Sequence, residues 1–425
     1  MSGPSRTFYV ETLGCPKNQV DSDKLVGTLV AQGMCAVEGA EHADLVVVNT
    51  CAFIEEARQE SIDVVLALAD RKAPDAQLVV TGCMAERYGD DLAQALPEVD
   101  AVAGFGVPVT LGRKPGPALP SFDLLNLPRP PAAAPWAYVK VAEGCDKACG
   151  FCAIPSFRGP QRSRTIGQVL AEVDELVAGG VREVVLVAQD LASFGRDQGV
   201  GTKDIVPLVE AVADRVPRVR LLYLYPSELT EPLVDAMLAS GVPYFDLSLQ
   251  HVSPTLLRRM RRWGHGDRFL RRIEGIRAMA PTAAFRSNFI VGYPGETEDD
   301  HDQLLAFIEA AQLDWCGFFA YSREDGTYAA DLDAVVPREL MDERLSELRE
   351  RQDVITAARR DDLIGEVVEV LVDAPGVARS HREAPEIDGI ITVPRHLAVG
   401  CLHQVRITGA EGPDSFAEAM VLAQR

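Results

Sequence analysis

The chain has 425 residues, of which 47% are hydrophobic and 25% charged, and it carries a net charge of −21. This length and hydrophobic content are sufficient for two or three domains with proper cores. The first ten residues hold no apolar signal segment, and no apolar run approaches the ~20 residues of a membrane span, so we expect a cytoplasmic protein without a membrane anchor. The acidic balance repels polyanions and favours basic partners, which argues against broad tRNA binding.

Residues 5–116 alternate strand-like and helix-like patterns and are predicted to form an N-terminal domain. Residues 7–13 alternate apolar and polar side chains, and helical patterns separate the short apolar runs 45–48 and 78–80. Such alternation predicts a parallel α/β sheet.

Three of the nine cysteines, Cys15, Cys51 and Cys83, each lie just beyond one of these predicted strands. Because the carboxyl ends of parallel strands meet at one edge, we expect the three to converge. Turn-forming residues surround each of them, which suits a ligand loop, although three buried packing residues are the alternative. We interpret them as ligands of a 4Fe-4S cluster with one open iron. The cysteines that we interpret as ordinary packing residues are Cys35, Cys316 and Cys401.

Residues 117–135 are predicted to be a stiff linker, since seven prolines fall between residues 115 and 135. Residues 136–361 then repeat a strand and a helix six times, which predicts a parallel sheet curled into a partial (β/α)6 barrel. A helix from about residue 337 closes this domain. Residues 364–425 contain short β-rich runs and glycine turns, which predict a small β-barrel.

The segment Glu143-Gly-Cys-Asp-Lys-Ala-Cys-Gly-Phe-Cys-Ala places Cys145, Cys149 and Cys152 in a C-x3-C-x2-C pattern. Three thiolates this close together can hold three irons of a cubane iron–sulfur cluster, which normally takes four cysteines. The next cysteine is Cys316, so one iron stays open for a ligand other than protein. A zinc site or a disulfide pair is the alternative, but zinc wants four ligands and the local pattern offers three.

This motif resembles that of the radical S-adenosylmethionine (SAM) enzymes. The resemblance implies that SAM chelates the open iron, that an electron from the cluster releases a deoxyadenosyl radical, and that Phe151 lies near the adenine. The residues at the predicted strand ends that we regard as hydrogen-bonding candidates for SAM are Gln189, Ser248, Gln250 and Asn288. Each of them could also be an ordinary polar residue at a strand end.

Two cysteine triplets, one dispersed and one in a barrel, with a C-terminal β domain, resemble the methylthiotransferases over nearly the whole chain. That family has an N-terminal methylthiotransferase domain, a radical-SAM barrel and a TRAM domain. The resemblance implies two 4Fe-4S clusters, of which the barrel cluster generates the radical and the N-terminal cluster carries or donates sulfur. It also implies a reductase or a flavodoxin-type protein as electron donor.

Within that family, the chain resembles the RimO branch, which modifies an aspartate β-carbon of ribosomal protein S-twelve. The enzymes that modify adenosine in tRNA usually carry Gly-Cys-Gln-Met-Asn at the first cysteine, whereas residues 14–18 here read Gly-Cys-Pro-Lys-Asn. Further matches to the RimO branch are residues 153–159, 248–254, 289–297 and 379–389. The substrate implied is ribosomal protein S-twelve, free or in the small subunit.

Charge agrees with a basic protein as substrate. Residues 364–425 contain five Lys or Arg and nine Asp or Glu, and residues 1–116 contain nine and seventeen. A TRAM domain that grips tRNA should be basic. We therefore expect the acidic C-terminal domain, with the loop 379–389, to dock the ribosomal protein and present its aspartate to the barrel mouth.

Two other functions stay open at this point. A tRNA adenosine methylthiotransferase would use the same chemistry on nucleic acid, and a non-catalytic iron–sulfur carrier would usually have four cysteines per cluster. A basic cluster on one predicted barrel helix is either a solvated face or a contact with ribosomal RNA. Its members are Arg258, Arg259, Arg261, Arg262, Arg268, Arg271 and Arg272.

Overall fold

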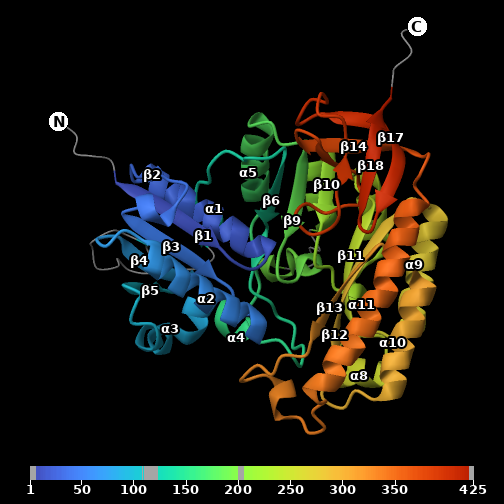
Figure 1. Ribbon diagram of the computed structural model, residues 1–425. Coiled ribbons are helices and arrows are strands. Elements are labelled where there is room, and N and C mark those ends of the chain that lie inside the picture. The colour runs from blue at the N-terminus through green and yellow to red at the C-terminus, as the bar shows by residue number, and fades with distance from the viewer. Residues whose placement is uncertain (1–5, 108, 110–122, 200–204, 421–425) are drawn as a thin grey trace.

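The computed structural model describes residues 6–107, 109, 123–199 and 205–420. An N-terminal sheet domain lies beside a central barrel, and a small C-terminal barrel lies on one end of the central one (Figure 1). Residues 117–122 of the predicted linker, residue 5 and residues 421–425 lie outside the described residues. Within the described ranges, no helix has the length and apolar character needed to cross a bilayer.

The N-terminal domain is a five-stranded, all-parallel sheet in the order β2-β1-β3-β4-β5, which confirms the predicted α/β class. Alternate residues of β3 point to opposite faces: Val46 and Val48 pack with α2 and α3, while Leu45 and Val47 pack with α1. The elements are β1 (Thr7–Thr12), α1 (Pro16–Ala31), β2 (Cys35–Ala36), η1 (Ala40–His42), β3 (Leu45–Thr50), α2 (Glu55–Arg71), β4 (Gln77–Gly82), α3 (Cys83–Ala95) and β5 (Ala101–Ala103).

The described end of the proline-rich segment runs over the surface of the protein and makes specific contacts. It begins with a short 3-10 helix, η2 (Asp123–Asn126), in which Leu125 is fully buried. Arg129 then donates to the backbone oxygen of Tyr138 and to Glu172. Arg129 also bonds Asp23 of α1, so this part of the segment contacts both the N-terminal domain and the barrel.

Six parallel strands form the central barrel in chain order. β6, β9 and β10 make one sheet, β11, β12 and β13 make another, and the parallel bridge between Leu224 and Leu247 joins the two. The predicted partial (β/α)6 barrel is confirmed. Its elements are β6 (Trp136–Lys140), β7 (Ala142–Glu143), α4 (Ile154–Arg158), β8 (Arg162–Ser163), α5 (Ile166–Ala178), β9 (Glu183–Val187), η3 (Leu191–Ser193), η4 (Arg196–Gln198), α6 (Ile205–Ala213), β10 (Arg218–Leu221), η5 (Pro226–Glu228), α7 (Glu231–Ala239), β11 (Tyr244–Gln250), α8 (Pro254–Arg259), α9 (Gly266–Met279), β12 (Ala284–Val291), α10 (Glu298–Ala311), β13 (Trp315–Ala320), η6 (Tyr328–Asp331) and α11 (Arg338–Asp361).

The period-two alternation of β11 separates the helix-facing side of the barrel from its interior. Phe245, Leu247 and Leu249 belong to the large core between strands and helices. Tyr244 belongs to a second cluster in the barrel interior, together with Val20 of α1. The helix α1 thus contributes a side chain to the open side of the barrel. The register of β11 with β12 shifts between Leu247 and Gln250, so the regular alternation is interrupted there.

The C-terminal residues form a closed five-stranded barrel in the order β14-β15-β16-β18-β17, as predicted. It follows α11, which ends at Asp361 close to the predicted position. A compact apolar core that includes Val370, Val405 and Ile407 fills it. Its strands are β14 (Val367–Ala374), β15 (Val377–Arg379), β16 (Ile391–Thr392), β17 (Leu402–Glu411) and β18 (Asp414–Ala419).

The small barrel sits on the amino ends of the central strands, opposite the cysteine motif (Figure 1). Glu183, the first residue of β9, bonds Arg220 and Arg379, and Tyr244, the first residue of β11, donates to Asp388. Since β11 spans seven residues, about 20 Å of strand separates this end from the barrel mouth.

The expectation that the acidic residues of the loop 379–389 dock a ribosomal protein is wrong for Glu383 and Asp388, whereas Glu386 is exposed. Glu383 is 1% exposed and is bonded by Arg360 and Ser380, and the Asp388 side chain is held by Tyr244. Burial raises the pKa of Asp388 to about 6, although Arg286 opposes the shift. These acidic groups fasten the C-terminal barrel to the central one, so they are not available to a partner.

Candidate functional site

The three N-terminal cysteines lie at the carboxyl edge of the first sheet. Cys15 precedes the first turn of α1, Cys51 follows β3 and Cys83 begins α3. Gly14 lies so close to Cys51 that a side-chain carbon at residue 14 would come within 3.0 Å of the Cys51 sulfur. Its φ of +94° also favours glycine. The Gly-Cys sequence therefore allows the first loop to approach the second.

A single buried asparagine joins the three cysteine loops. The Asn18 amide nitrogen donates to the backbone oxygens of Leu13 (2.9 Å) and Thr50 (3.1 Å), next to Cys15 and Cys51. Its side-chain oxygen accepts from the Cys83 thiol at 3.5 Å. Sequence analysis did not single out Asn18, because its partners are backbone atoms that only the folded sheet edge brings together.

The local electrostatics differ among these thiols. Burial and, to a smaller extent, the neighbouring Cys15 and Cys83 raise the pKa of Cys51 to about 12. Burial also raises the pKa of Cys83, against the opposing charge of Arg158. Burial acts in the same direction on Cys15, but Lys17 and Arg158 outweigh it and lower the pKa of this thiol. Cys15 is thus the thiol of the three that ionises most readily.

The second cysteine triplet occupies the loop between β7 and α4 at the barrel mouth. The Gly150 backbone, in the middle of this loop, donates to Met260 at 2.8 Å and accepts from Ala329 at 2.7 Å. Burial raises the pKa of Cys145 to about 11 and that of Cys152 to about 12. Binding of iron to these thiols must therefore release protons.

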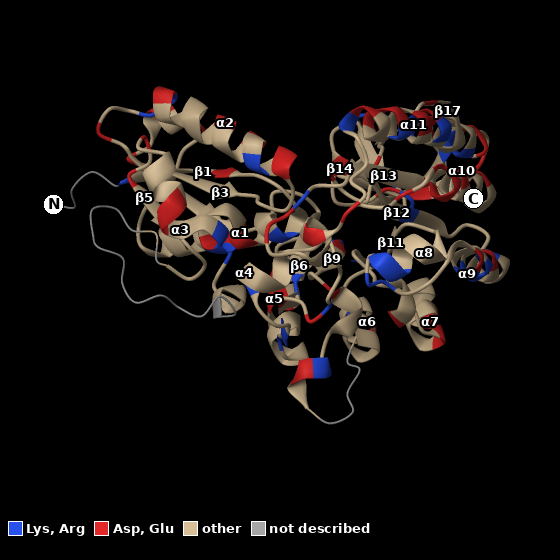
Figure 2. Cartoon of the chain, turned by 90° about the horizontal axis from the view of Figure 1, so that it is seen from below, with Lys and Arg blue, Asp and Glu red and all other residues tan. Residues whose placement is uncertain are grey.

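Arg262 reaches the barrel triplet from outside the motif. Its guanidinium donates to the Cys149 sulfur at 3.2 Å and to the backbone oxygen of Ser248. The predicted basic cluster is therefore not one helical face, because its members are divided among α8, the following turn and α9 (Figure 2). Arg261 lies over the Tyr328 ring at 3.8 Å and Arg268 over Trp263 at 4.1 Å.

The predicted SAM contacts lie at the same mouth. The Gln189 amide donates to Glu143, and its buried oxygen has no partner among the described residues. The buried side-chain oxygen of Asn288 likewise has no described partner. Ser248 and Gln250 lie in the last three residues of β11, where the register with β12 shifts, and Gln250 has a φ of +70°.

The aromatic Phe151 lies directly before Cys152. Its side chain is partly buried and packs against the main barrel core. Orphaned polar atoms and a half-covered aromatic ring at one mouth are features of a ligand site.

Arg158, at the end of α4, joins the two cysteine sites. This guanidinium donates to Glu143 at 2.9 Å and to Cys83 at 3.0 Å, and it also bonds Asn18 at 3.0 Å. Glu143 directly precedes the barrel motif and also pairs with Lys140. Burial disfavours the carboxylate, but Arg158 and Lys140 lower the pKa of Glu143 to about 2. One buried cation therefore touches both halves of the site.

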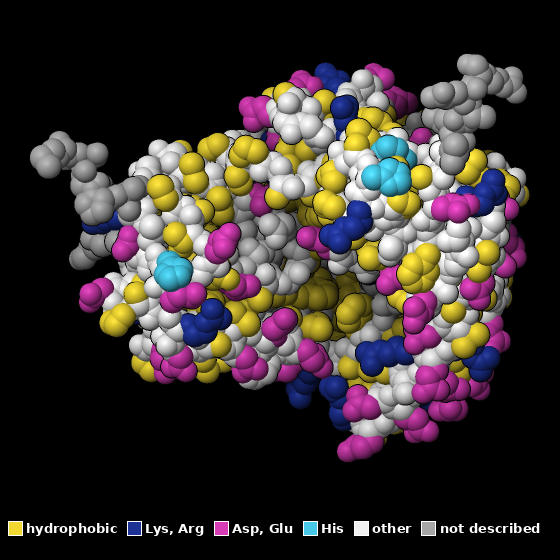
Figure 3. Space-filling view, turned by 45° about the horizontal axis from the view of Figure 1, so that its top comes forward, with side chains coloured by type: hydrophobic (Ala, Val, Ile, Leu, Met, Phe, Trp, Pro, Cys, Tyr) yellow, Lys and Arg dark blue, Asp and Glu magenta, His cyan; other side chains and the backbone are white. Residues whose placement is uncertain are grey.

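A second contact holds the N-terminal domain against the barrel. Glu324 is 2% exposed and pairs with Arg58 at 2.6 Å and Arg87 at 2.5 Å, both from the N-terminal domain. The surface is hollowed between the two domains, and hydrophobic side chains cover the floor of this hollow (Figure 3). Each cysteine site lies within one domain, and docking of the two domains brings the two sites together.

Replacing Glu324 by Gln is expected to weaken this docking by about 1–3 kcal/mol, because Arg87 loses its carboxylate and Arg58 keeps only Glu55. Faster limited proteolysis between the domains would report the loosening. The matched control is Glu56→Gln, which removes an exposed ion pair with Arg338 across the same two domains and should change little. Equal effects of the two substitutions would contradict this role of Glu324.

The arrangement suits iron–sulfur clusters better than single metal ions. Over the described residues, no group of three His, Cys, Asp or Glu side chains is positioned to hold one ion. In a cubane cluster each cysteine binds a different iron, so the thiols need not meet at one point. All six predicted ligands are free thiols, and each triplet has one arginine donating to a sulfur. The residues present therefore fit two such clusters.

Three family descriptions match the chain: Uncharacterized protein family UPF0004 over residues 7–104, the Radical SAM superfamily over 139–308 and the TRAM domain over 364–420. The chain is 41% identical to the ribosomal protein uS12 methylthiotransferase RimO of Kineococcus radiotolerans, over 99% of both chains. It belongs to the RimO family of radical-SAM methylthiotransferases.

Other RimO relatives agree. The RimO of Moorella thermoacetica is 42% identical over 90% of this chain and 92% of its own length, and that of Chloroflexus aurantiacus is 40% identical over 97% and 99%. The radical SAM methyltransferase TsrM from Kitasatospora setae, solved with cobalamin and a [4Fe-4S] cluster, shares the fold. Its TM-score is 0.54 at 14% identity, with 93% of this chain and 84% of that chain covered.

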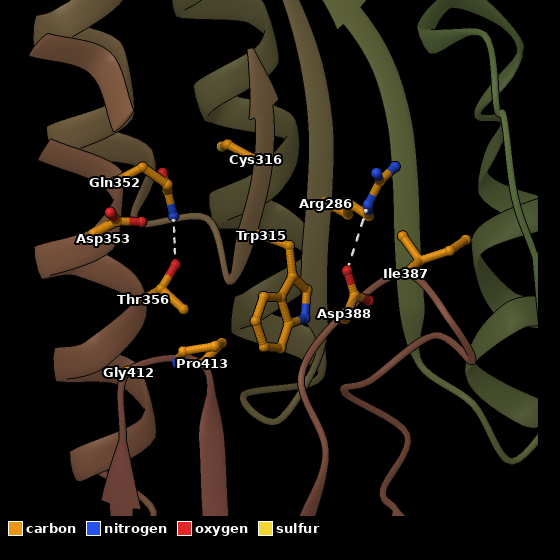
Figure 4. Close-up of a pocket in the computed structure, with 10 residues that line it drawn as sticks. All are labelled: Arg286, Trp315, Cys316, Gln352, Asp353, Thr356, Ile387, Asp388, Gly412 and Pro413. Atoms are coloured by element: carbon orange, nitrogen blue, oxygen red, sulfur yellow. Dashed lines mark hydrogen bonds and ion pairs between the residues drawn. The ribbon is translucent and has the colours of Figure 1, made fainter. Parts of the chain in front are cut away.

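A cavity of about 380 Å³ lies away from the RimO-type cysteine sites. It is enclosed by α11, the first residues of β12 and β13, and the turn between β17 and β18 (Figure 4). Cys316 and Trp315 line this cavity. None of the residues predicted to bind a cluster or SAM lines it. The packing role predicted for the remaining cysteines holds only for Cys316, which contacts the main core, because Cys35 and Cys401 are exposed.

His251, directly after β11, makes the stability of this RimO-type fold dependent on pH. The ring is fully buried, its Nδ1 accepts from the Ser253 N–H, and burial lowers its pKa from 6.5 to about 4. Because only the unfolded chain binds this proton between those values, the free energy of unfolding falls as the pH drops from about 6.5 to 4, by about 3 kcal/mol. His251→Asn should remove this component from denaturant unfolding curves, whereas replacing the exposed His42 should not.

Proposed function

We propose that this protein transfers a methylthio group to the β-carbon of an aspartate in ribosomal protein uS12, with SAM as methyl donor and radical source. The observation that carries the proposal is the junction at Arg158, which bonds Cys83 of one triplet and Glu143 beside the other. Two cysteine triplets this close suit a reaction in which a hydrogen atom is abstracted from a carbon at one site and sulfur is added to that carbon from the other. Membership of the RimO family supports the ribosomal protein as substrate.

The cluster ligands that we propose are Cys145, Cys149 and Cys152 for the barrel cluster and Cys15, Cys51 and Cys83 for the N-terminal one. When bound, the barrel cluster would supply the electron that splits SAM, and the second cluster would supply the sulfur. The chain itself provides a charge-assisted hydrogen bond at each site, from Arg262 to Cys149 and from Arg158 to Cys83. These bonds stabilise the thiolate form that iron requires.

For SAM we propose contacts at the mouth of the barrel. Gln189 and Asn288 each have a buried oxygen without a partner among the described residues, which favours a bound ligand. Ser248 and Gln250 lie at the carboxyl end of β11, and we propose that they also contact SAM. Phe151 would pack against the adenine, since its ring is only partly covered by the barrel core.

We further propose that the reaction takes place in the cytoplasm and that a reductase or a flavodoxin-type protein supplies the electrons. The domain boundaries that we propose are 5–116, 117–135, 136–361 and 364–425. The three family matches lie inside the first, third and fourth of these ranges, which supports the division.

The test is anaerobic incubation of the reconstituted protein with SAM, a reductant and either purified uS12 or tRNA, followed by mass analysis. The expected product is uS12 in which one methylthio group replaces one aspartate hydrogen, with tRNA unchanged. Methylthiolated adenosine in tRNA, with uS12 untouched, would contradict the proposal.

A further inference from the structure

Lys17, at the junction of the two domains, interacts with the charge of the Cys15 thiol but forms no ion pair with a carboxylate among the described residues. Its ammonium lies 3.2 Å from the centre of the Tyr223 ring, and the side chain is partly exposed. Within the part of the chain that the structure describes, this ammonium has no hydrogen bond or ion pair to an acidic residue. Holding an ammonium inside a protein without a carboxylate is unfavourable unless a ligand supplies one.

The neighbouring cations, in contrast, are all paired. Lys140 bonds Asp21 at 2.7 Å, and Arg158 bonds Glu143 at 2.9 Å. Arg286, lower in the barrel, bonds Asp246 at 3.2 Å and lies 3.5 Å from Asp388. Lys17 is therefore the cation of this group that has no carboxylate paired with it among the described residues. Because the other three cations have carboxylate partners, Lys17 is not simply one of many surplus positive charges in this region.

The backbone around the partner ring is held in an unusual conformation. Tyr223, just after β10, has a φ of +64°, a value that bulky residues rarely adopt. Its backbone N–H donates to Asp246 at 2.9 Å, which keeps the turn in place. The aromatic face is thereby fixed beneath the Lys17 ammonium. Lys17 follows Cys15 by two residues in the sequence, so its side chain is held close to the N-terminal cysteine site. Strain that is maintained in this way is typical of functional sites.

We propose that Lys17 is the anchor for a carboxylate of the substrate, namely the side chain of the target aspartate. The inference rests on the proposed function, since it is the aspartate of uS12 that brings the carboxylate. The carboxyl carbon is bonded directly to the β-carbon, so fixing the carboxylate also fixes the carbon that receives the methylthio group. The first turn of α1 adds a favourable dipole for an anion at this place.

The test measures binding of uS12 that carries either the target aspartate or asparagine at that position. The reconstituted wild type is expected to bind the aspartate form about 10–100-fold more tightly, which is the usual advantage of a desolvated charge-assisted hydrogen bond. Lys17→Met should reduce this preference to near one by weakening only the aspartate form. Lys17→Arg should keep most of it.

Iron content and SAM cleavage are recorded for every variant, and Lys72→Met serves as a control because Lys72 lies at the far end of α2. An unchanged aspartate preference in Lys17→Met would overturn the inference. So would loss of about half the iron, because Lys17 would then serve the N-terminal cluster. Failure of the wild type to methylthiolate uS12 would instead refute the proposed function, so the two failures are distinguishable.

Discussion

Replacing Cys145, Cys149 and Cys152 together by alanine is expected to remove about half of the bound iron and to abolish SAM cleavage. The reason is that these thiols lie in one clamped loop at the barrel mouth, separate from the other triplet. Replacing Cys15, Cys51 and Cys83 should also remove about half of the iron, yet it should leave uncoupled SAM cleavage intact. Iron analysis and chromatography of deoxyadenosine give both readouts.

The matched control replaces two exposed cysteines, Cys35 and Cys401, which lie outside both triplets. This double variant should keep its full iron content and its methylthio transfer. Full iron in either triple variant would refute the ligand assignment of that triplet. Loss of SAM cleavage in the N-terminal triple variant would show that the two sites are not separable.

Replacing Glu183 by alanine is expected to lower the free energy of unfolding by about 3–5 kcal/mol. Glu183 is fully buried at the start of β9 and accepts from Arg220 at 2.7 Å and Arg379 at 3.1 Å. Burial disfavours the carboxylate, but these arginines lower the pKa of Glu183 to about 2. Removing it leaves the buried Arg220 without its carboxylate and Arg379 with only Asp373, between the central and C-terminal barrels, which is strongly destabilising.

Denaturant unfolding measures this loss, and hydrogen exchange should localise it to residues 364–420 and the amino ends of the strands. The control is Glu369→Ala, which removes a half-exposed carboxylate 3.4 Å from Arg218 at the same interface and should cost less than about 1 kcal/mol. A cost for Glu183→Ala as small as that of the control would show that the buried network is dispensable.

The architecture was predictable from sequence because it depends on local patterns. The alternation in residues 7–13 and the apolar runs of the barrel determine strands whichever partners they have. The same reasoning predicted that cysteines after parallel strands would share one edge, and Cys15, Cys51 and Cys83 do lie at that edge.

What the sequence did not predict depends on contacts between segments far apart in the chain. The loop 379–389 was recognisable as a motif, but its acidic residues gave no sign that Arg360 would bond Glu383 or that Tyr244 would bond Asp388. Arg158 and Arg262 belong to strings that were noted for resemblance or for charge, and only the fold brings each of them to a cysteine sulfur. Sequence period gives the face of a strand, but not the domain that covers its end.

The most direct test of the proposed chemistry follows one hydrogen atom. The reconstituted protein is incubated anaerobically with SAM and with uS12 in which the aspartate β-carbons carry deuterium, and the deoxyadenosine is analysed by mass spectrometry. The account predicts that deuterium enters deoxyadenosine in step with methylthiolation of uS12. Methylthiolated uS12 formed while deoxyadenosine stays free of deuterium would contradict it.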